Sequence, residues 1–135
     1  DRTDGKRETF DNLQPTNHLF YGYMDFVSLQ NLNNYRFQIK ADPVKKLNLQ
    51  ADLHVIFLDS PKDNLYAANR SIKRATVPGA DAFVGNEVDL LAKYQVAQYA
   101  ATMVGYSHFF AGDFLADTGS ADDADFFYVQ TVLNF

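Results

Sequence analysis

The sequence lacks cysteine, an excess of positive charge and any long, purely apolar run. Without cysteine the chain can form neither a disulfide framework nor a thiolate metal site, which fits a periplasmic or outer-membrane protein. The formal net charge of −5 argues against nucleic-acid binding, because no basic face offsets phosphate repulsion. Tyr94–Gly112 has no Asp, Glu, Lys or Arg, but it contains Gln95, Gln98 and His108. Polar groups at that density are costly in lipid, so two strands joined by a turn explain the segment better than a membrane helix.

Motifs of familiar enzyme classes are also missing. The sequence has no Gly-x-Ser-x-Gly elbow, no HExxH motif and no P-loop. His18, His54 and His108 are too scattered for a metal triad, and the acidic residues of 113–125 do not have EF-hand spacing. We therefore expect no enzyme activity, no metal and no cofactor.

What the sequence does contain is a strict alternation of apolar and polar residues. Every odd position of Leu47–Phe57 is apolar. A period of two predicts a strand with one apolar and one polar face. Alternation also predicts strands at Tyr35–Asp42, Glu87–Tyr94 and Phe126–Phe135. Ala97–Phe110 is predicted as a fifth strand, but small and aromatic residues occupy both of its faces, so its inner face is not assigned.

The connections between these strands alternate in length. Pro43–Lys46 and Gln95–Val96 read as tight turns, and Leu58–Asn86 and Ala111–Asp125 as long loops. Bacterial outer-membrane barrels have short periplasmic turns and longer external loops. If the last strand ends in the periplasm, both turns lie there and both loops lie outside. The pattern predicts an all-β fold, an antiparallel up-and-down transmembrane β-barrel in the bacterial outer membrane.

About five or six strands are too few to close such a barrel, for which eight is the usual minimum. An open edge in lipid would leave backbone groups unpaired. We therefore expect residues 1–135 to be the C-terminal part of one barrel domain, with 1–34 an external loop or partial strand and 35–135 the strands, their short periplasmic turns and their long external loops. Assembly from several copies is the other option.

Three points stay open at this stage. The aromatic-rich segment His18–Asn34 is either a rim or inward-folded loop that narrows the pore, or part of a further strand. The main rival fold is a soluble periplasmic β-barrel that binds an apolar ligand, in which Leu49 and Leu53 point inward rather than to lipid. A barrel enzyme acting on lipids would need a buried Ser-His pair, and Ser107 and His108 lie on opposite faces of a strand.

Several motifs resemble the C-terminal region of the alginate export family of outer-membrane proteins. The run Phe10-Asp-Asn-Leu-Gln-Pro-Thr-Asn-His18 matches the family's Phe-Asp-x-Leu-x-Pro-Thr segment. Phe20-Tyr-Gly-Tyr-Met-Asp-Phe26, Leu29-Gln-Asn-Leu32 and Gly85-Asn-Glu-Val-Asp-Leu90 follow in the family's order. Gly105-Tyr-Ser-His-Phe-Phe-Ala-Gly-Asp-Phe114 is similar to its Gly-Tyr-x-His-x-Phe-x-Gly pattern.

This resemblance implies a large single-chain barrel that lets a polysaccharide or another polar solute cross the outer membrane. The resemblance is to a family whose best-understood members form an export pore for alginate, an anionic uronic-acid polymer. Arginines line that pore. Here Arg36 and Lys40 are cationic, but Asp52, Glu87 and Asp89 are acidic. We expect a passive, porin-like channel for a polar or anionic saccharide.

The polar strand faces would form the pore wall, where charged side chains set selectivity. The expected pore-lining residues are Arg36, Gln38, Lys40, Asn48, Gln50, Asp52, His54, Glu87, Asp89 and Lys93. In a plainer interpretation, Arg36 or Lys40 pairs with Asp52 across the strands and only keeps the wall soluble.

Two further features suggest contacts outside the pore. Arg70, Lys73 and Arg74 form a basic cluster in the first long loop, where they either attract an acidic polymer or lipopolysaccharide phosphates or are simply solvated. Phe135 ends the last strand with an aromatic residue, as expected of an assembly signal read by the barrel assembly machinery. Outer-membrane lipid is the expected partner of the apolar strand faces.

Overall fold

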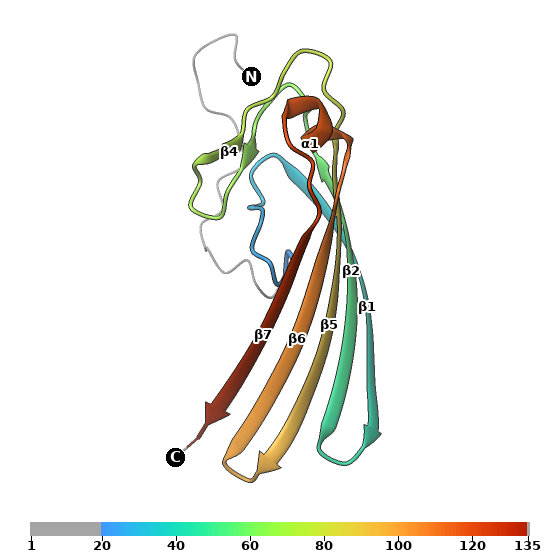
Figure 1. Cartoon of the computed structure of the whole chain (residues 1–135), viewed down its shortest axis with the longest axis vertical. Coiled ribbons are helices and arrows are strands. Elements are labelled where there is room, and N and C mark those ends of the chain that lie inside the picture. The colour runs from blue at the N-terminus through green and yellow to red at the C-terminus, as the bar shows by residue number, and fades with distance from the viewer. Residues whose placement is uncertain (1–19, 135) are drawn as a thin grey trace.

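A five-stranded antiparallel sheet dominates the computed structural model, which describes residues 20–134 (Figure 1). Its strands lie side by side in sequence order and are β1 (Leu32–Val44), β2 (Leu47–Leu58), β5 (Phe83–Ala97), β6 (Ala100–Ala111) and β7 (Ala124–Leu133). The loop between β2 and β5 carries the small pair β3 (Leu65–Tyr66) and β4 (Ile72–Arg74), and the loop before β7 carries helix α1 (Asp113–Thr118). The predicted all-β, up-and-down antiparallel fold is confirmed, and the sheet is open, with β1 and β7 at its edges.

The two tight turns differ in detail from the prediction. β1 continues through Pro43 and Val44, with a register shift after Ala41, so the first turn is Lys45–Lys46. The predicted turn Gln95–Val96 is wrong, because both residues belong to β5 and residues 98–99 turn instead. The Gln95 side chain reaches into this hairpin, where its Nε2 donates to the carbonyl oxygens of residues 97 and 100 at 2.7 and 3.2 Å. In Figure 1 both turns lie at one end of the sheet and the long loops at the other.

The strand register sorts the side chains into two faces, because directly opposed residues share a face and successive residues alternate. Arg36 opposes His54, which opposes Glu87, and the neighbouring polar positions follow the same rows. We call this polar side the inner face. It carries all ten residues predicted to line a pore: Arg36, Gln38, Lys40, Asn48, Gln50, Asp52, His54, Glu87, Asp89 and Lys93.

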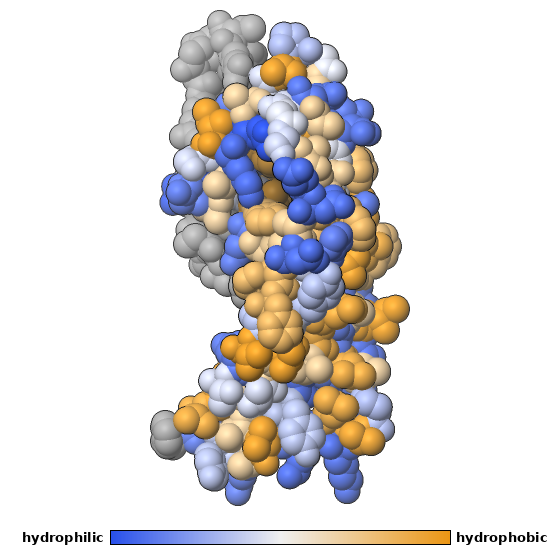
Figure 2. Space-filling view, viewed as in Figure 1, coloured by the Kyte–Doolittle hydropathy of each residue, from blue (hydrophilic) through white to orange (hydrophobic). Residues whose placement is uncertain are grey.

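The opposite side, the outer face, exposes large apolar side chains along its whole length. Its exposed residues include Tyr35, Phe37, Ile39, Leu49, Leu53, Leu90, Tyr94, Val104, Phe110, Phe127 and Val129. In Figure 2 apolar residues gather over the middle of the molecule, and hydrophilic residues concentrate over the loops and recur at the turns.

Aromatic residues lie near both ends of this apolar band. Phe57 packs between Tyr35 and Phe83 near the loops, with ring centroids 6.4 and 5.2 Å apart, and Tyr94 and Tyr99 are exposed near the turns. From Phe83 to Tyr94 the strand runs about 36 Å at ~3.3 Å per residue. At a tilt of ~40° that is about 28 Å along a barrel axis, close to the ~25 Å apolar band of outer-membrane barrels. Within residues 20–134 no helix is long and apolar enough to cross a membrane.

The packed apolar core lies at the loop end of the molecule. Its buried members are Val27, Leu32, Ile56, Leu58, Leu65, Ala80, Val84, Phe109 and Phe114. They come from strand ends, from residues 20–31, from β3, from the segment before β5 and from α1. The core therefore fastens the loops to the sheet, whereas the turn end carries few buried residues.

Candidate functional site

Asp52 lies in the middle of the inner face and is 2% exposed. Its Oδ1 accepts hydrogen bonds from Arg36 Nε at 3.0 Å and Gln38 Nε2 at 2.8 Å, and its Oδ2 accepts one from Gln50 Nε2 at 2.5 Å. Three donors from β1 and β2 thus compensate for the burial of the carboxylate. The Arg36–Asp52 ion pair of the plainer interpretation is present in the structure.

Asp89 belongs to a buried polar chain that crosses four strands. The Ser107 hydroxyl donates to Asp89 Oδ1, and His54 Nε2 lies 3.6 Å from Asp89 Oδ2. The other ring nitrogen of His54 lies 3.0 Å from Asn34 Nδ2 and 3.2 Å from its Oδ1. Asp89 stands between Ser107 and His54, so the histidine is not placed to take a proton from the serine. His108 is on the outer face, where its Nδ1 lies 2.7 Å from Asp125 Oδ1.

The third buried acid, Glu87, is covered by residues 20–31, which we call the inward loop. Met24 N donates to Glu87 Oε1 at 2.9 Å. Gly22 approaches so closely that a Cβ there would lie 2.5 Å from the carboxylate carbon, and its φ is +107°. Glycine accommodates both the contact and the backbone angle. Of the alternatives that the sequence left open for this segment, the structure contains the inward-folded loop, and β1 begins only at Leu32.

An aromatic stack fixes the same loop to the last strand. The Tyr23 ring stacks on Tyr128 with centroids 5.6 Å apart and an interplanar angle of 14°, and Phe126 stacks on Tyr128 at 5.4 Å. Tyr128 opposes Gly105 across β6 and β7, and a Cβ on Gly105 would lie 2.2 Å from its ring. The absent side chain of Gly105 therefore makes room for a ring that in turn supports the inward loop.

The basic loop cluster is mostly engaged in contacts within the protein. Lys73 Nζ donates to the Phe26 carbonyl at 2.6 Å and lies 4.2 Å from the centroid of its ring. The Arg74 guanidinium donates to the carbonyl of Thr118, the last residue of α1, and to that of Ser120 in the following loop. Arg70 is exposed, at a positive φ of 68°. Lys73 and Arg74 thus join the external loops to one another and to the inward loop.

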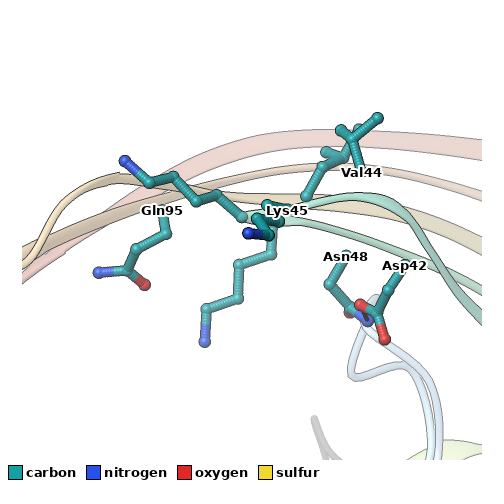
Figure 3. Close-up of a pocket in the computed structure, with 8 residues that line it drawn as sticks. Asp42, Val44, Lys45, Asn48 and Gln95 are labelled. Atoms are coloured by element: carbon teal, nitrogen blue, oxygen red, sulfur yellow. Dashed lines mark hydrogen bonds between the residues drawn. The ribbon is translucent and has the colours of Figure 1, made fainter.

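Most exposed charges of the inner face are positive, whereas its buried charges are acids, and Asp42 beside the first turn is an exposed acid. The three acids are almost fully buried, whereas Lys40 and Lys93 are exposed nearer the turns. A hollow of about 530 Å³ at the turn end is lined by Asp42, Val44, Lys45, Lys46, Leu47, Asn48, Lys93 and Gln95. In Figure 3 Asn48 and Asp42 turn toward each other beneath the arched strands, with Asn48 Nδ2 3.0 Å from Asp42 Oδ1, and Val44 points to the other side.

Sequence reasoning missed Gly22, Gly105 and Tyr128 as parts of the site, and it placed Tyr23 only in a possible rim or inward-folded loop. A glycine within an alternating strand was the available signal at Gly105, since it often marks a close approach of another group. Phe135 and the Phe10–His18 motif lie outside the described residues. Within residues 20–134 no group of three or more His, Asp or Glu side chains is arranged to hold a metal ion.

A sheet with a polar inner face, an uncovered apolar outer face and aromatic residues at both ends of that outer face is the wall of a β-barrel. Leu49 and Leu53 lie on the outer face, opposite to their place in an apolar-ligand binder. The family model for alginate export matches residues 1–129, and the chain belongs to this family. It is a transport family rather than an enzyme family. No curated protein and no solved structure gives a significant match to the chain.

Proposed function

We propose that this chain is the C-terminal part of a larger outer-membrane barrel that acts as a passive export channel for an anionic polysaccharide. One observation carries the choice of an anionic solute. Asp52, Glu87 and Asp89 in the middle of the inner face are buried, and toward its turn end the exposed Lys40, Lys45, Lys46 and Lys93 outnumber the exposed Asp42.

The buried acids contribute less to the field in the pore than their number suggests. Asp52 is paired with Arg36 and receives two amide donors, and Glu87 receives a backbone N–H. A carboxylate held in this way is already solvated by the protein. The mixed charge seen in the sequence is therefore divided between buried acids in the middle of the wall and a turn end where exposed lysines outnumber Asp42.

The lysines of the turn end supply the attraction. One ammonium in water attracts a carboxylate ~7 Å away by roughly 0.6 kcal/mol before screening, and physiological salt lowers this by about half. A polymer with a charge on each sugar is attracted by several lysines at once, and their attraction energies add. The lysines are Lys40, Lys45, Lys46 and Lys93. Clustered charge of this kind raises the local concentration of the polymer at the mouth without binding it tightly.

The membrane location rests on the family and on the outer face. The apolar band is about 28 Å high at a tilt of ~40°, the height that a lipid-facing barrel surface needs. With the short turns in the periplasm, the lysine-lined hollow would face the side from which an exported polymer arrives.

Ion selectivity of the complete barrel tests the proposal. The full-length protein containing this chain would be reconstituted in planar lipid bilayers, and the reversal potential measured under a KCl gradient. We expect a preference for chloride that weakens in Lys93→Glu and reverses in the Lys40→Glu/Lys93→Glu double variant. Lys62→Glu, in the external loop, is the matched control and should leave the ratio unchanged. A wild-type pore that prefers potassium would refute an anionic solute.

A further inference from the structure

The inward loop carries an inference that rests on the proposed function and goes beyond it. We infer that residues 20–31 determine the charge selectivity of the pore by covering Glu87 and its neighbours Asp52 and Asp89. Without this cover the middle of the inner face would present three carboxylates to the solute against one guanidinium, that of Arg36. With it, the exposed charges along the passage are mainly lysines, with Asp25 of the loop and Asp42 beside the first turn as the exposed acids.

The contacts of the loop concentrate on this acidic patch. Met24 N donates to Glu87 Oε1 at 2.9 Å, and Gly22 packs directly on the same carboxylate. Tyr23 stacks on Tyr128, which lies one row away from Asp89 toward the turns. The loop therefore touches the wall where the acids are rather than at an arbitrary height.

Additional contacts hold the two ends of the loop in place. At the start, Asn34 Nδ2 donates to the Phe20 carbonyl at 3.2 Å. Further along, the Phe26 carbonyl accepts from Lys73 Nζ, and the Phe26 ring packs edge-on against Phe109 at 5.3 Å. These contacts hold the loop on both sides of Gly22–Met24, so we expect substitutions within that segment to leave the sheet folded.

The composition of the loop suits a cover over acids in a pore for anions. Within residues 20–31 the only charged side chain is Asp25, so the cover replaces three carboxylates by one. Its contact to Glu87 is a backbone N–H, which stabilises the buried carboxylate without placing a cation in the passage. A cation there would hold an anionic polymer and slow its passage, since conduction requires that binding stay weak.

Two variants release the loop through different contacts. Tyr23→Ala removes the stack on Tyr128, and Gly22→Ala adds a Cβ that clashes with the Glu87 carboxylate at a backbone angle unsuited to alanine. Both should raise single-channel conductance and lower the chloride-to-potassium permeability ratio. From the Coulomb energy at ~7 Å with screening, we expect roughly 1.5- to 3-fold per uncovered carboxylate at ~0.1 M salt, and more at lower salt.

Glu87→Gln distinguishes the effect of an uncovered carboxylate on selectivity from the effect of a wider pore. A glutamine oxygen can still accept the Met24 N–H, so the single variant should resemble the wild type. In the Tyr23→Ala background, Glu87→Gln should reverse part of the selectivity change and leave the raised conductance. Phe20→Ala is the matched control, because this exposed aromatic of the same loop uses only its backbone carbonyl to bond the wall.

The outcomes distinguish this inference from the proposed function. A wild-type pore that prefers potassium contradicts the proposed function. If the wild-type pore prefers chloride and Tyr23→Ala and Gly22→Ala leave that preference unchanged, the inward loop does not set selectivity by covering the acids. A selectivity change that Glu87→Gln does not diminish in the Tyr23→Ala background overturns the inference as well, because Glu87 is the carboxylate that the loop touches directly. Unchanged migration of the folded barrel in unheated gels shows that each variant is assembled.

Discussion

Gly105 and Tyr128 face each other across β6 and β7, and replacing Gly105 by alanine tests whether their contact stabilises the wall. The new Cβ would lie 2.2 Å from the Tyr128 ring, so the ring has to leave its position. It would then lose its stacks with Tyr23 and Phe126. Each aromatic pair contributes about 0.5–1.5 kcal/mol, and forcing an atom into a filled site costs about 1–3 kcal/mol. We expect Gly105→Ala to lower the free energy of unfolding by about 2–4 kcal/mol.

The decisive measurement is the same substitution in a Tyr128→Ala background. With the ring removed, alanine at position 105 meets no obstacle and should be neutral or stabilising by about 0.5–1 kcal/mol, because glycine weakens a strand. Urea titration of the refolded barrel gives the free energies, with the folded band in unheated gels as the readout, since this part of the barrel has no tryptophan. Gly79→Ala is a control with a φ of +83° and no atom within 4 Å of the new Cβ, so its cost should not depend on Tyr128. An equal cost of Gly105→Ala in both backgrounds would refute the contact.

Two further predictions use the same titration. Arg36→Ala should lower the free energy of unfolding by about 1–2 kcal/mol, because buried Asp52 keeps only its two amide donors while solvent partly screens the lost charge. In an Asp52→Asn background the same substitution should have no such effect. An equal loss in both backgrounds would contradict the pairing. Leu90→Arg on the outer face should cost about 2–4 kcal/mol in a lipid bilayer, and Gln50→Arg at a neighbouring height on the inner face much less. Equal effects of the two arginines would contradict a lipid-facing outer surface.

The strands were predictable because their signal is local. In Leu47–Phe57 the polarity of each side chain predicts the face of the sheet on which it lies. The observed strand is one residue longer than the predicted one. β6 could not be divided into faces, since small and aromatic residues alternate without a polar side. The structure supplies the reason: Gly105 is small because a ring from β7 occupies its place.

The site was predictable only in part, for the same physical reason. Alternation brought the ten polar residues onto one face, but it carried no information about which of them solvent reaches. That depends on contacts between residues distant in sequence, such as Met24 and Glu87, which are 63 positions apart. The turn after β5 was misplaced because alternation alone does not mark where a strand ends, and the Gln95 amide bridges the hairpin from within the strand.

The confinement of the apolar core to the loop end makes the two ends of this wall mechanically unequal. At the loop end, side chains from the inward loop, β3 and α1 pack on the strands. At the turn end, the hairpins are stabilised mainly by strand pairing and by the surroundings of the outer face. Regions with few buried contacts open more easily than regions under a packed core. We therefore expect amide hydrogens in the strands to exchange more slowly at the loop end than at the turn end.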